Sequence, residues 1–236
     1  MFVVCHMLTS LDGKIDGDFF GVEEIAPALK VYGERREYYN CPAALYGTTT
    51  MLGGYSDGLV PVLPREKGIC IYEDWINEQG AALGNFIISV DPKGELGFLS
   101  NILEKKGRPA AHVIEALTHQ VSAEYLTYLR KLGISYIFAG QDRLDCTLLL
   151  QKLQKYFNIE NLMIAGGGVI NWSFLQEGII DEVRIVIAPI ADGGTTSVSI
   201  FERADFMPLH SPVVFSLKEV QVFDGNVLWL RYGVVK

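Results

Sequence analysis

The sequence predicts an α/β fold in which a mixed, mostly parallel sheet is flanked by helices and ends in a C-terminal antiparallel hairpin. Two observations predict it. Short apolar runs rich in β-branched residues alternate with segments of helical periodicity, which is typical of parallel strands joined by helices. The last two apolar runs are joined instead by the short turn Asp224-Gly225-Asn226, which favours an antiparallel pair. With no repeat or linker, residues 1–236 are expected to form a single domain.

The predicted elements follow in chain order. Strands are expected at residues 2–8, 43–47, 85–90, 111–116, 134–139, 161–165 and 183–190, and the hairpin at residues 213–223 and 227–235. Helices are expected at residues 24–39, 123–132 and 146–157. In the last of these the large apolar residues share one face, so Lys152 and Lys155 are expected to face solvent. Residues 53–82 are predicted to form an irregular excursion.

Composition excludes several classes of partner. Hydrophobic residues make up 49% of the chain, enough for a sizeable core, and the net charge of −8 argues against nucleic acid or an anionic membrane. The N-terminal apolar run is too short for a signal peptide and no run is long enough to span a bilayer, so a cytoplasmic protein is expected. The cysteines and histidines show no zinc spacing, so no metal is expected and the thiols are taken as free: Cys5, Cys41, Cys70 and Cys146.

Three consecutive glycines, Gly166 to Gly168, stand between an apolar strand and a segment of helical spacing. A strand, a glycine turn and a helix N-terminus together favour an anion site, because unpaired N–H groups point outward and absent side chains let a pyrophosphate approach. The dinucleotide motif G-x-G-x-x-G is not met, since Asn171 occupies the position of its third glycine. A tight turn with close strand–helix packing explains the glycines equally, and both readings stay open.

A second turn of this kind follows the strand at 43–47, where Gly47 is followed by Thr48, Thr49 and Thr50. A threonine hydroxyl here either caps a short helix or donates to a phosphate. Capping is the simpler reading for this segment alone. Two such turns in one sheet are what a dinucleotide requires, because its pyrophosphate is held from more than one side.

The opening stretch TSLDGKIDG carries Asp12 and Lys14 around a turn after the first strand. A lysine oriented by an aspartate can hydrogen-bond a substrate oxygen or phosphate and so position a substrate. An ordinary Asp-Gly turn with a solvated lysine is an equal alternative. We expect Asp12 and Lys14 to lie on the rim of the same cleft as Gly166 to Gly168, because ligands gather at the carboxyl ends of parallel strands. His6 is expected to be a core histidine.

The stretches LTSLDGKI, LYGTTTM, IISVDPKGEL and AGGGVINWSFLQEGIIDEVRIVIAPIADGG resemble the riboflavin-biosynthesis reductases, including the reductase half of the bifunctional deaminase–reductase. The resemblance implies a dihydrofolate-reductase-like fold, NADPH as hydride donor and a homodimer. It also implies a small heterocyclic or C=N/C=O substrate, with 5-amino-6-(5-phosphoribosylamino)uracil or its 2,5-diamino analogue as candidates. The zinc motif of the deaminase half is absent from the sequence.

The resemblance also assigns residues. It places Asp12 and Lys14 at the substrate and nicotinamide, as the catalytic pair, and makes Lys93 a partner for the 2′-phosphate. The cofactor-binding residues that it implies are Gly47, Thr48, Thr50, Asp91, Lys93, Gly140, Gly166, Gly167, Gly168, Val169 and Ile170.

Two positions depart from the family pattern. Ala165 stands where a glutamate usually reaches the substrate, and Gly54 stands where an aspartate usually follows Thr50. Loss of the carboxylate at Ala165 removes a polar contact to substrate and predicts poor activity or none on the riboflavin-pathway pyrimidine. The alternatives are a catalytically idle NADP-binding protein, which these two departures favour, and a dihydrofolate reductase.

Overall fold

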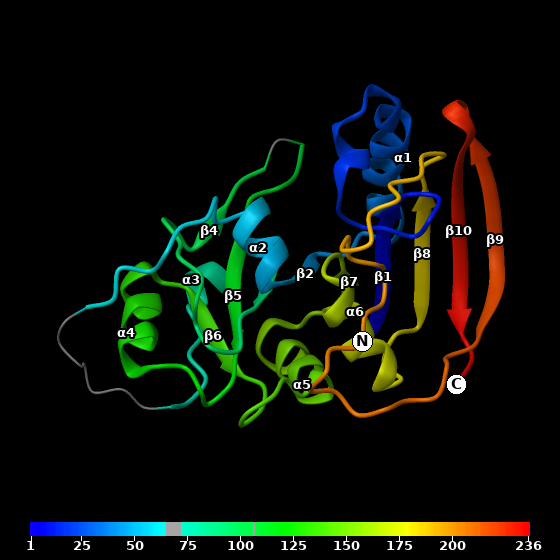
Figure 1. Ribbon diagram of the computed structural model, residues 1–236. Coiled ribbons are helices and arrows are strands. Elements are labelled where there is room, and N and C mark those ends of the chain that lie inside the picture. Colours follow the sequence, from blue (N-terminus) through cyan, green and yellow to red (C-terminus); the bar gives the residue numbers. More distant parts are fainter. Residues whose placement is uncertain (65–71, 106) are drawn as a thin grey trace. The chain divides into compact units, whose positions relative to one another are not determined.

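The computed structural model describes residues 1–64, 72–105 and 107–236, and its contacts divide the chain into two compact units (Figure 1). Unit 1 consists of Pro42–Glu160 together with Met1, and unit 2 consists of Phe2–Cys41 and Asn161–Lys236. Each unit contains strands and helices of its own. The expectation of one domain over residues 1–236 stays a prediction.

Unit 1 is built around parallel strands. β5 pairs with β3 on one side and β3 pairs with β2, while β6 and the short antiparallel β4 share the other side of β5. The strands are β2 (Ala43–Gly47), β3 (Phe86–Val90), β4 (Ile102–Leu103), β5 (Ala111–Leu117) and β6 (Ser135–Phe138). Every residue of β2, β3, β5 and β6 is buried, as expected for a parallel sheet covered on both faces.

The two long helices of unit 1 have the predicted bounds, because their ends are encoded locally. α4 (Ala123–Leu132) begins at Ser122, whose hydroxyl accepts from the Tyr125 amide, and ends at the left-handed Gly133. α5 (Cys146–Phe157) begins at Asp145, which accepts from the Leu148 amide, and ends at the left-handed Asn158. The shorter helices are α2 (Thr48–Gly54) and α3 (Glu78–Ala81).

Unit 2 contains the other strands. β1 lies between two parallel neighbours, β7 and β8, and β8 then pairs with the antiparallel hairpin of β10 and β9. These strands are β7 (Asn161–Ile164), β1 (Phe2–Thr9), β8 (Glu182–Ile187), β10 (Val227–Val234) and β9 (Phe215–Phe223). The hairpin turns at the predicted place, through the 3-10 turn η4 (Asp224–Asn226). The predicted fold class, a mixed and mostly parallel sheet with a C-terminal antiparallel hairpin, is confirmed.

The helices of unit 2 lie against these strands. α6 (Gly168–Gln176) follows β7, and α1 (Ala26–Arg36) packs its buried Ala28 and Val31 against Val186 and Trp229 of the sheet. The continuous helix expected over 24–39 is wrong at both ends. Pro27 in the first turn of α1 separates it from the 3-10 turn η2 (Glu23–Ile25), and the 3-10 turn η3 (Glu37–Tyr39) follows α1.

The excursion over 53–82 is only partly irregular. It contains α3, whose N-cap Asn77 accepts from the amides of Gln79 and Gly80, a local signal that the sequence prediction missed. Residues 65–71 of this stretch, including Cys70, lie outside the described residues. Cys5, Cys41 and Cys146 are free thiols. In the part of the chain that the structure describes, no helix has the length and apolar character needed to cross a membrane.

Candidate cofactor and substrate site

The glycine run forms the turn between β7 and α6 in unit 2. Gly167 is the N-cap of α6 with φ 85° and ψ 119°, a backbone conformation that only glycine adopts without strain, and no side chain caps the helix. A Cβ at Gly167 would meet only the Ile170 side chain, at 3.9 Å and beyond, so the space beside it is open. The first-turn amides of Gly168, Val169 and Ile170 have no partner within an α-helix. The turn has the form of an anion site.

Gly168 is a glycine for a different reason. A Cβ there would lie 2.4 Å from the Ser199 carbonyl oxygen and 3.1 Å from Glu202 Cγ. Its own carbonyl accepts from the Glu202 amide at 3.0 Å, and Asn171 Nδ2 donates to the Ile200 carbonyl at 2.8 Å. The segment 197–202 therefore packs directly on the start of α6. Close packing, the alternative considered for the whole run, accounts for Gly168, and backbone conformation with open space accounts for Gly167.

Asp12, in the turn after β1, is held by its neighbours. Its carboxylate accepts from Ser10 Oγ at 2.6 Å and from the amides of Asp192 at 3.0 Å and Gly193 at 2.9 Å. These bonds hold the pKa of Asp12 well below its ordinary value, and the bond from Ser10 has the largest effect. The suggested pairing of Asp12 with Lys14 is not found. Asp12 instead joins the turn after β1 to the loop after β8.

Lys14 lies beside the same segment that packs on the glycine turn. It forms an isolated β-bridge with Ser199, and its Nζ donates to the Ser197 carbonyl oxygen at 3.0 Å. Since the Ser199 carbonyl faces Gly168, the signature and the glycine run contact one common segment within unit 2. This geometry is consistent with their predicted proximity. The catalytic role of Asp12 and Lys14 stays a prediction.

The remaining predicted cofactor residues lie in unit 1, at the carboxyl ends of its parallel strands. Thr118, after β5, donates from Oγ1 and from its amide to the Pro92 carbonyl oxygen after β3, at 2.7 and 3.0 Å. The His119 amide donates to the Gly140 carbonyl oxygen after β6, at 3.3 Å. These bonds tie the loops that carry Lys93, His119 and Gly140 into one edge. At Gly140 a Cβ would lie 1.8 Å from the Arg143 carbonyl oxygen, so the turn requires glycine.

Asp91 and Lys93 have different environments on this edge. The Asp91 carboxylate is buried, and its Oδ2 accepts from the amides of Glu95 at 2.6 Å and Leu96 at 2.8 Å. Burial raises the pKa of Asp91 above its ordinary value. Asp91 therefore shapes the turn that presents Lys93. Lys93 is exposed and has no ion-pair partner among the described residues.

The second glycine turn joins β2 to α2. Gly47 is the N-cap, with no capping side chain, and the Thr48 hydroxyl donates to the Val90 carbonyl oxygen at 2.8 Å. The simpler reading of a threonine N-cap is therefore wrong, because Thr48 ties the end of β2 to the end of β3. Thr50 lies half-buried in the first turn of α2.

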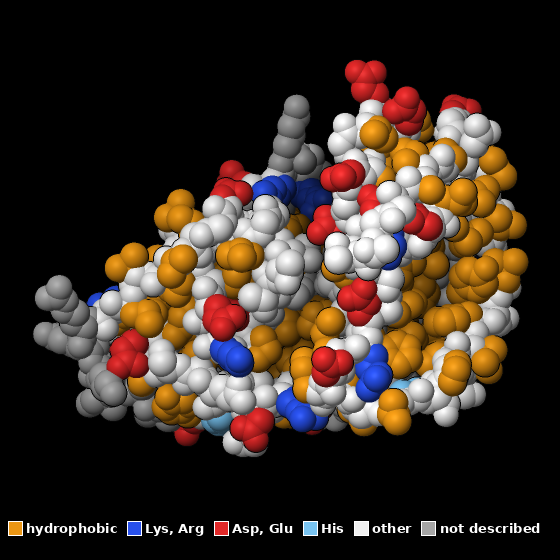
Figure 2. Space-filling view, in the orientation of Figure 1, with side chains coloured by type: hydrophobic (Ala, Val, Ile, Leu, Met, Phe, Trp, Pro, Cys, Tyr) orange, Lys and Arg blue, Asp and Glu red, His pale blue; other side chains and the backbone are white. Residues whose placement is uncertain are grey.

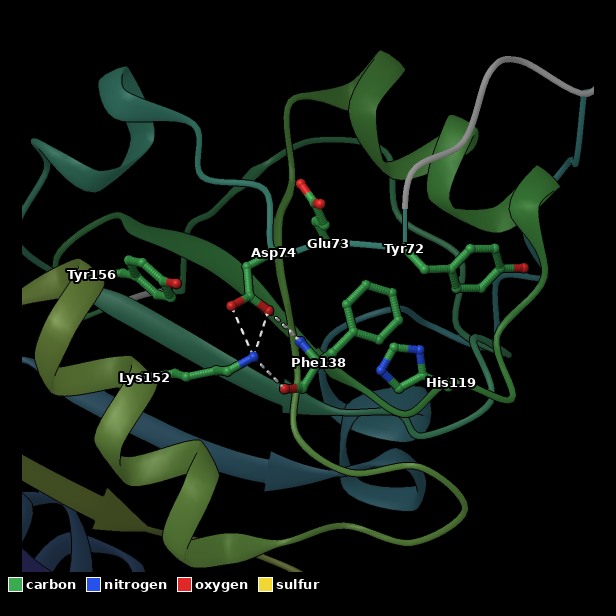
Figure 3. A pocket seen from close by; sticks show the side chains of 7 residues that line it. All are labelled: Tyr72, Glu73, Asp74, His119, Phe138, Lys152 and Tyr156. Carbon is green, nitrogen blue, oxygen red and sulfur yellow. Dashed lines mark hydrogen bonds and ion pairs between the residues drawn. The ribbon is translucent and has the colours of Figure 1, made fainter.

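A pocket that sequence reasoning missed opens in unit 1 (Figure 3), with a volume of about 370 Å³. The rings of His119 and Phe138 stack at 4.6 Å between centroids, and Tyr72 lies 5.9 Å from Phe138. Lys152 forms an ion pair of 2.8 Å with Asp74 and donates to the Phe138 carbonyl oxygen at 2.8 Å. The prediction that Lys152 faces solvent is wrong, because Asp74 holds it at the pocket.

The chemistry of this pocket suits a flat ring. One wall is aromatic, and the ion pair of Asp74 and Lys152 supplies polar atoms at the other side (Figure 3). His119 belongs both to the pocket and to the edge that includes Gly140. The only feature of the sequence that could have indicated His119 as a site residue is its position directly after an apolar strand. Among the described residues no group of His, Cys, Asp or Glu is arranged to hold a metal ion.

Comparison with known proteins fits this architecture. Residues 88–229, more than half of the chain, match the family model described as the RibD C-terminal domain. A 2,5-diamino-6-ribosylamino-4(3H)-pyrimidinone 5′-phosphate reductase from Methanothermobacter thermautotrophicus is 38% identical over 240 residues, covering 99% of this chain and 98% of the relative. A protein of the same name from Aquifex aeolicus is 34% identical over 136 residues, or 58% of each chain.

Solved structures agree with this result. RibD from Acinetobacter baumannii aligns with a TM-score of 0.65 at 21% identity, over 99% of this chain and 58% of the other. A riboflavin biosynthesis reductase from Saccharomyces cerevisiae aligns with a TM-score of 0.61 at 17% identity, over 99% of this chain and 90% of the other. The fold is thus that of the riboflavin-pathway reductases, and the dihydrofolate-reductase-like class stays a prediction. The chain belongs to the RibD C-terminal domain family, the reductases of riboflavin biosynthesis.

Proposed function

We propose that this protein is an NADPH-dependent reductase that acts on 2,5-diamino-6-ribosylamino-4(3H)-pyrimidinone 5′-phosphate or its aminouracil analogue. The observation that carries the proposal is the match over nearly the whole of a relative that bears this activity in its name. When bound, NADPH supplies the hydride, and the chain supplies binding and orientation. We also propose that the protein acts in the cytoplasm.

A homodimer is part of this proposal. β9 is an edge strand that pairs only with β10 among the described strands, and it exposes Leu217, Val220 and Val222. Figure 2 shows hydrophobic side chains gathered over β9 and β10, at the right of the view. An exposed edge with apolar side chains is a surface that a second copy would cover.

The glycine turn before α6 fits a pyrophosphate. The open space beside Gly167 admits phosphate oxygens close to the backbone, and the first-turn amides of α6 are donors for them. The helix dipole adds partial positive charge at this end. Gly166, Gly168, Val169 and Ile170 complete this proposed contact. In unit 1, Gly47, Thr48 and Thr50 form the other proposed cofactor turn.

The edge of loops after β3, β5 and β6 fits the adenosine end. Lys93 stands exposed on a turn that the buried Asp91 holds in shape, and its charge would favour a 2′-phosphate. The stacked rings of His119 and Phe138, beside Gly140, would receive the adenine ring. A single edge thus offers a cation for the phosphate and an aromatic wall for the base.

Replacing Lys14 with alanine is expected to lower turnover while NADPH affinity changes little. The reason is that Lys14 is proposed to bind a substrate oxygen or phosphate, whereas the pyrophosphate contacts the glycine turn. Steady-state kinetics and NADPH titration check this. Lys30→Ala is a matched control, because Lys30 is a solvent-exposed lysine of the same unit. Equal loss of NADPH affinity and turnover in Lys14→Ala would remove Lys14 from the substrate side.

Wild-type protein is expected to oxidise NADPH with the pyrimidinone phosphate, but with weak substrate binding, because buried Ala165 offers no carboxylate. Ala165→Glu is expected to lower KM by one to two decades, the equivalent of about 1.5–3 kcal/mol for a hydrogen bond to a charged group. The rate at which the reduced-nicotinamide absorbance falls measures both the turnover of the wild type and the KM of each protein. Ala165→Gln keeps the size without the charge and is expected to give a smaller gain.

The opposite result has a definite meaning. NADPH binding without oxidation, across this pyrimidinone and its aminouracil analogue, would support a catalytically idle NADP-binding protein. An ordinary wild-type KM that Ala165→Glu leaves unchanged would instead show that another group makes the contact.

A further inference from the structure

A cluster of two cations and two tyrosines in unit 1 has no role in the site described above. Lys105 and Arg108 lie in the connection between β4 and β5, where the Arg108 amide donates to the Lys105 carbonyl oxygen at 3.0 Å. Arg108 Nη1 donates to the hydroxyls of Tyr55 at 2.8 Å and Tyr46 at 3.3 Å. Lys105 Nζ lies 5.1 Å from the centre of the Tyr55 ring. The two tyrosine rings are 4.8 Å apart and form a platform for both cations.

These cations differ from the ion-paired cations of the described residues in how they are held. Lys152, Arg231 and Lys236 each contact a carboxylate, in a protein whose net charge is −8. Lys105 and Arg108 are exposed and contact no carboxylate among the described residues. Neutral aromatic rings and hydroxyls hold two like charges close together, which leaves their positive charge available to an anion.

Gly54 directly precedes Tyr55, a residue of this platform. A Cβ at Gly54 would have no atom within 4 Å, so the end of α2 beside Tyr55 is uncrowded.

The platform also has a position relative to the proposed cofactor turn. Tyr46 immediately precedes Gly47, and Tyr55 immediately follows α2. The two tyrosines therefore stand at either end of the helix that begins at the second glycine turn. An anion on Lys105 and Arg108 would lie beside this helix.

We propose that Lys105 and Arg108 form a binding subsite for a phosphate monoester. The planar guanidinium donates in a fork that matches phosphate oxygens, and the tyrosine hydroxyls orient it, while Lys105 adds a second charge. The proposal rests on the proposed function, in which substrate and NADPH each carry one phosphate monoester. Because Lys93 is the proposed partner of the 2′-phosphate, the 5′-phosphate of the substrate is the expected occupant.

The test compares phosphorylated and unphosphorylated ligands. Arg108→Ala and Lys105→Ala are each expected to raise KM for the pyrimidinone phosphate about tenfold, the effect of one lost charge-assisted hydrogen bond, and to leave KM for the dephosphorylated compound unchanged. Arg108→Gln keeps a donor for the tyrosine hydroxyls without the charge and should behave like Arg108→Ala. Lys131→Ala removes an exposed lysine of the same unit and should change neither value.

A second measurement is independent of turnover. Calorimetric titration with ribose 5-phosphate and with ribose should show that the wild type favours the phosphate and that Arg108→Ala loses this preference, even if no pyrimidine is reduced. Selective loss of NADPH over NADH in Arg108→Ala would support the subsite and assign it to the 2′-phosphate. Equal effects on phosphorylated and unphosphorylated ligands, or none on either, would overturn the proposal while leaving the proposed reductase activity standing.

Discussion

Gly167→Val is expected to abolish the rise in melting temperature that NADPH gives the wild-type protein. At 100 times its Kd, a ligand that binds only the folded state adds about 2.7 kcal/mol, or roughly 5–10 °C for a chain of this size. Valine would fill the open space beside the turn, where we propose that the pyrophosphate lies. It would also strain the backbone, since φ is 85° at Gly167, and lower stability by about 1–2 kcal/mol without ligand.

The control for this variant lies at the other end of the same helix. Gly178 follows α6 with φ 69°, and a Cβ there would have no atom within 4 Å. Gly178→Val also places a side chain on a residue with positive φ, away from the proposed contact, and is expected to keep the full NADPH shift. Differential scanning fluorimetry with and without NADPH compares the two. A Gly167→Val protein that NADPH still stabilises fully would remove the glycine turn from the cofactor site.

Lys93→Ala and His119→Ala are expected to separate the two parts of the adenosine end. Loss of the Lys93 charge should weaken NADPH about tenfold and leave NADH nearly unchanged, because only NADPH carries the 2′-phosphate. Loss of the His119 ring should weaken both cofactors by a similar factor, about tenfold, because stacking on a base contributes about 1–3 kcal/mol. Equilibrium titration of each variant with each cofactor gives four ratios of the variant Kd to the wild-type Kd.

The matched control here is Lys155→Ala, which removes an exposed lysine whose ammonium contacts the neighbouring Tyr156 and no carboxylate among the described residues. It should affect neither cofactor. If Lys93→Ala weakened NADPH and NADH equally, Lys93 would act on a part that both share. If His119→Ala changed neither, the aromatic pocket would have another occupant.

The glycine run predicted local structure but not the reason for each glycine. The pattern located the turn and the helix after it, and left phosphate binding and close packing as alternatives for the whole run. The structure divides them, because Gly167 has a positive φ with open space and Gly168 meets the Ser199 carbonyl oxygen. Ser199 is far from Gly168 in the chain, so no local pattern could reveal this contact.

For the opening stretch TSLDGKIDG, the sequence indicated a site but not the contacts of its residues. Its residues indicated a site, and the structure places Lys14 beside the segment that packs on the glycine turn. Asp12 was expected to contact and orient Lys14, and that contact is not found. The amides that Asp12 binds, those of Asp192 and Gly193, belong to a loop whose approach depends on the pairing of β1 with β8.

By itself, the sequence determined what short-range interactions encode. Caps at Ser122 and Asp145 define where α4 and α5 begin, the Asp224 turn defines the hairpin, and buried apolar runs define the parallel strands. Only the tertiary structure decided which side chains meet: Lys152 with Asp74, His119 with Phe138, and Arg108 with Tyr46 and Tyr55. The physical reason is range. The hydrogen bonds of a cap or turn form within a few residues, whereas a pocket brings together side chains from segments far apart in the chain. No local sequence pattern shows that those segments will meet.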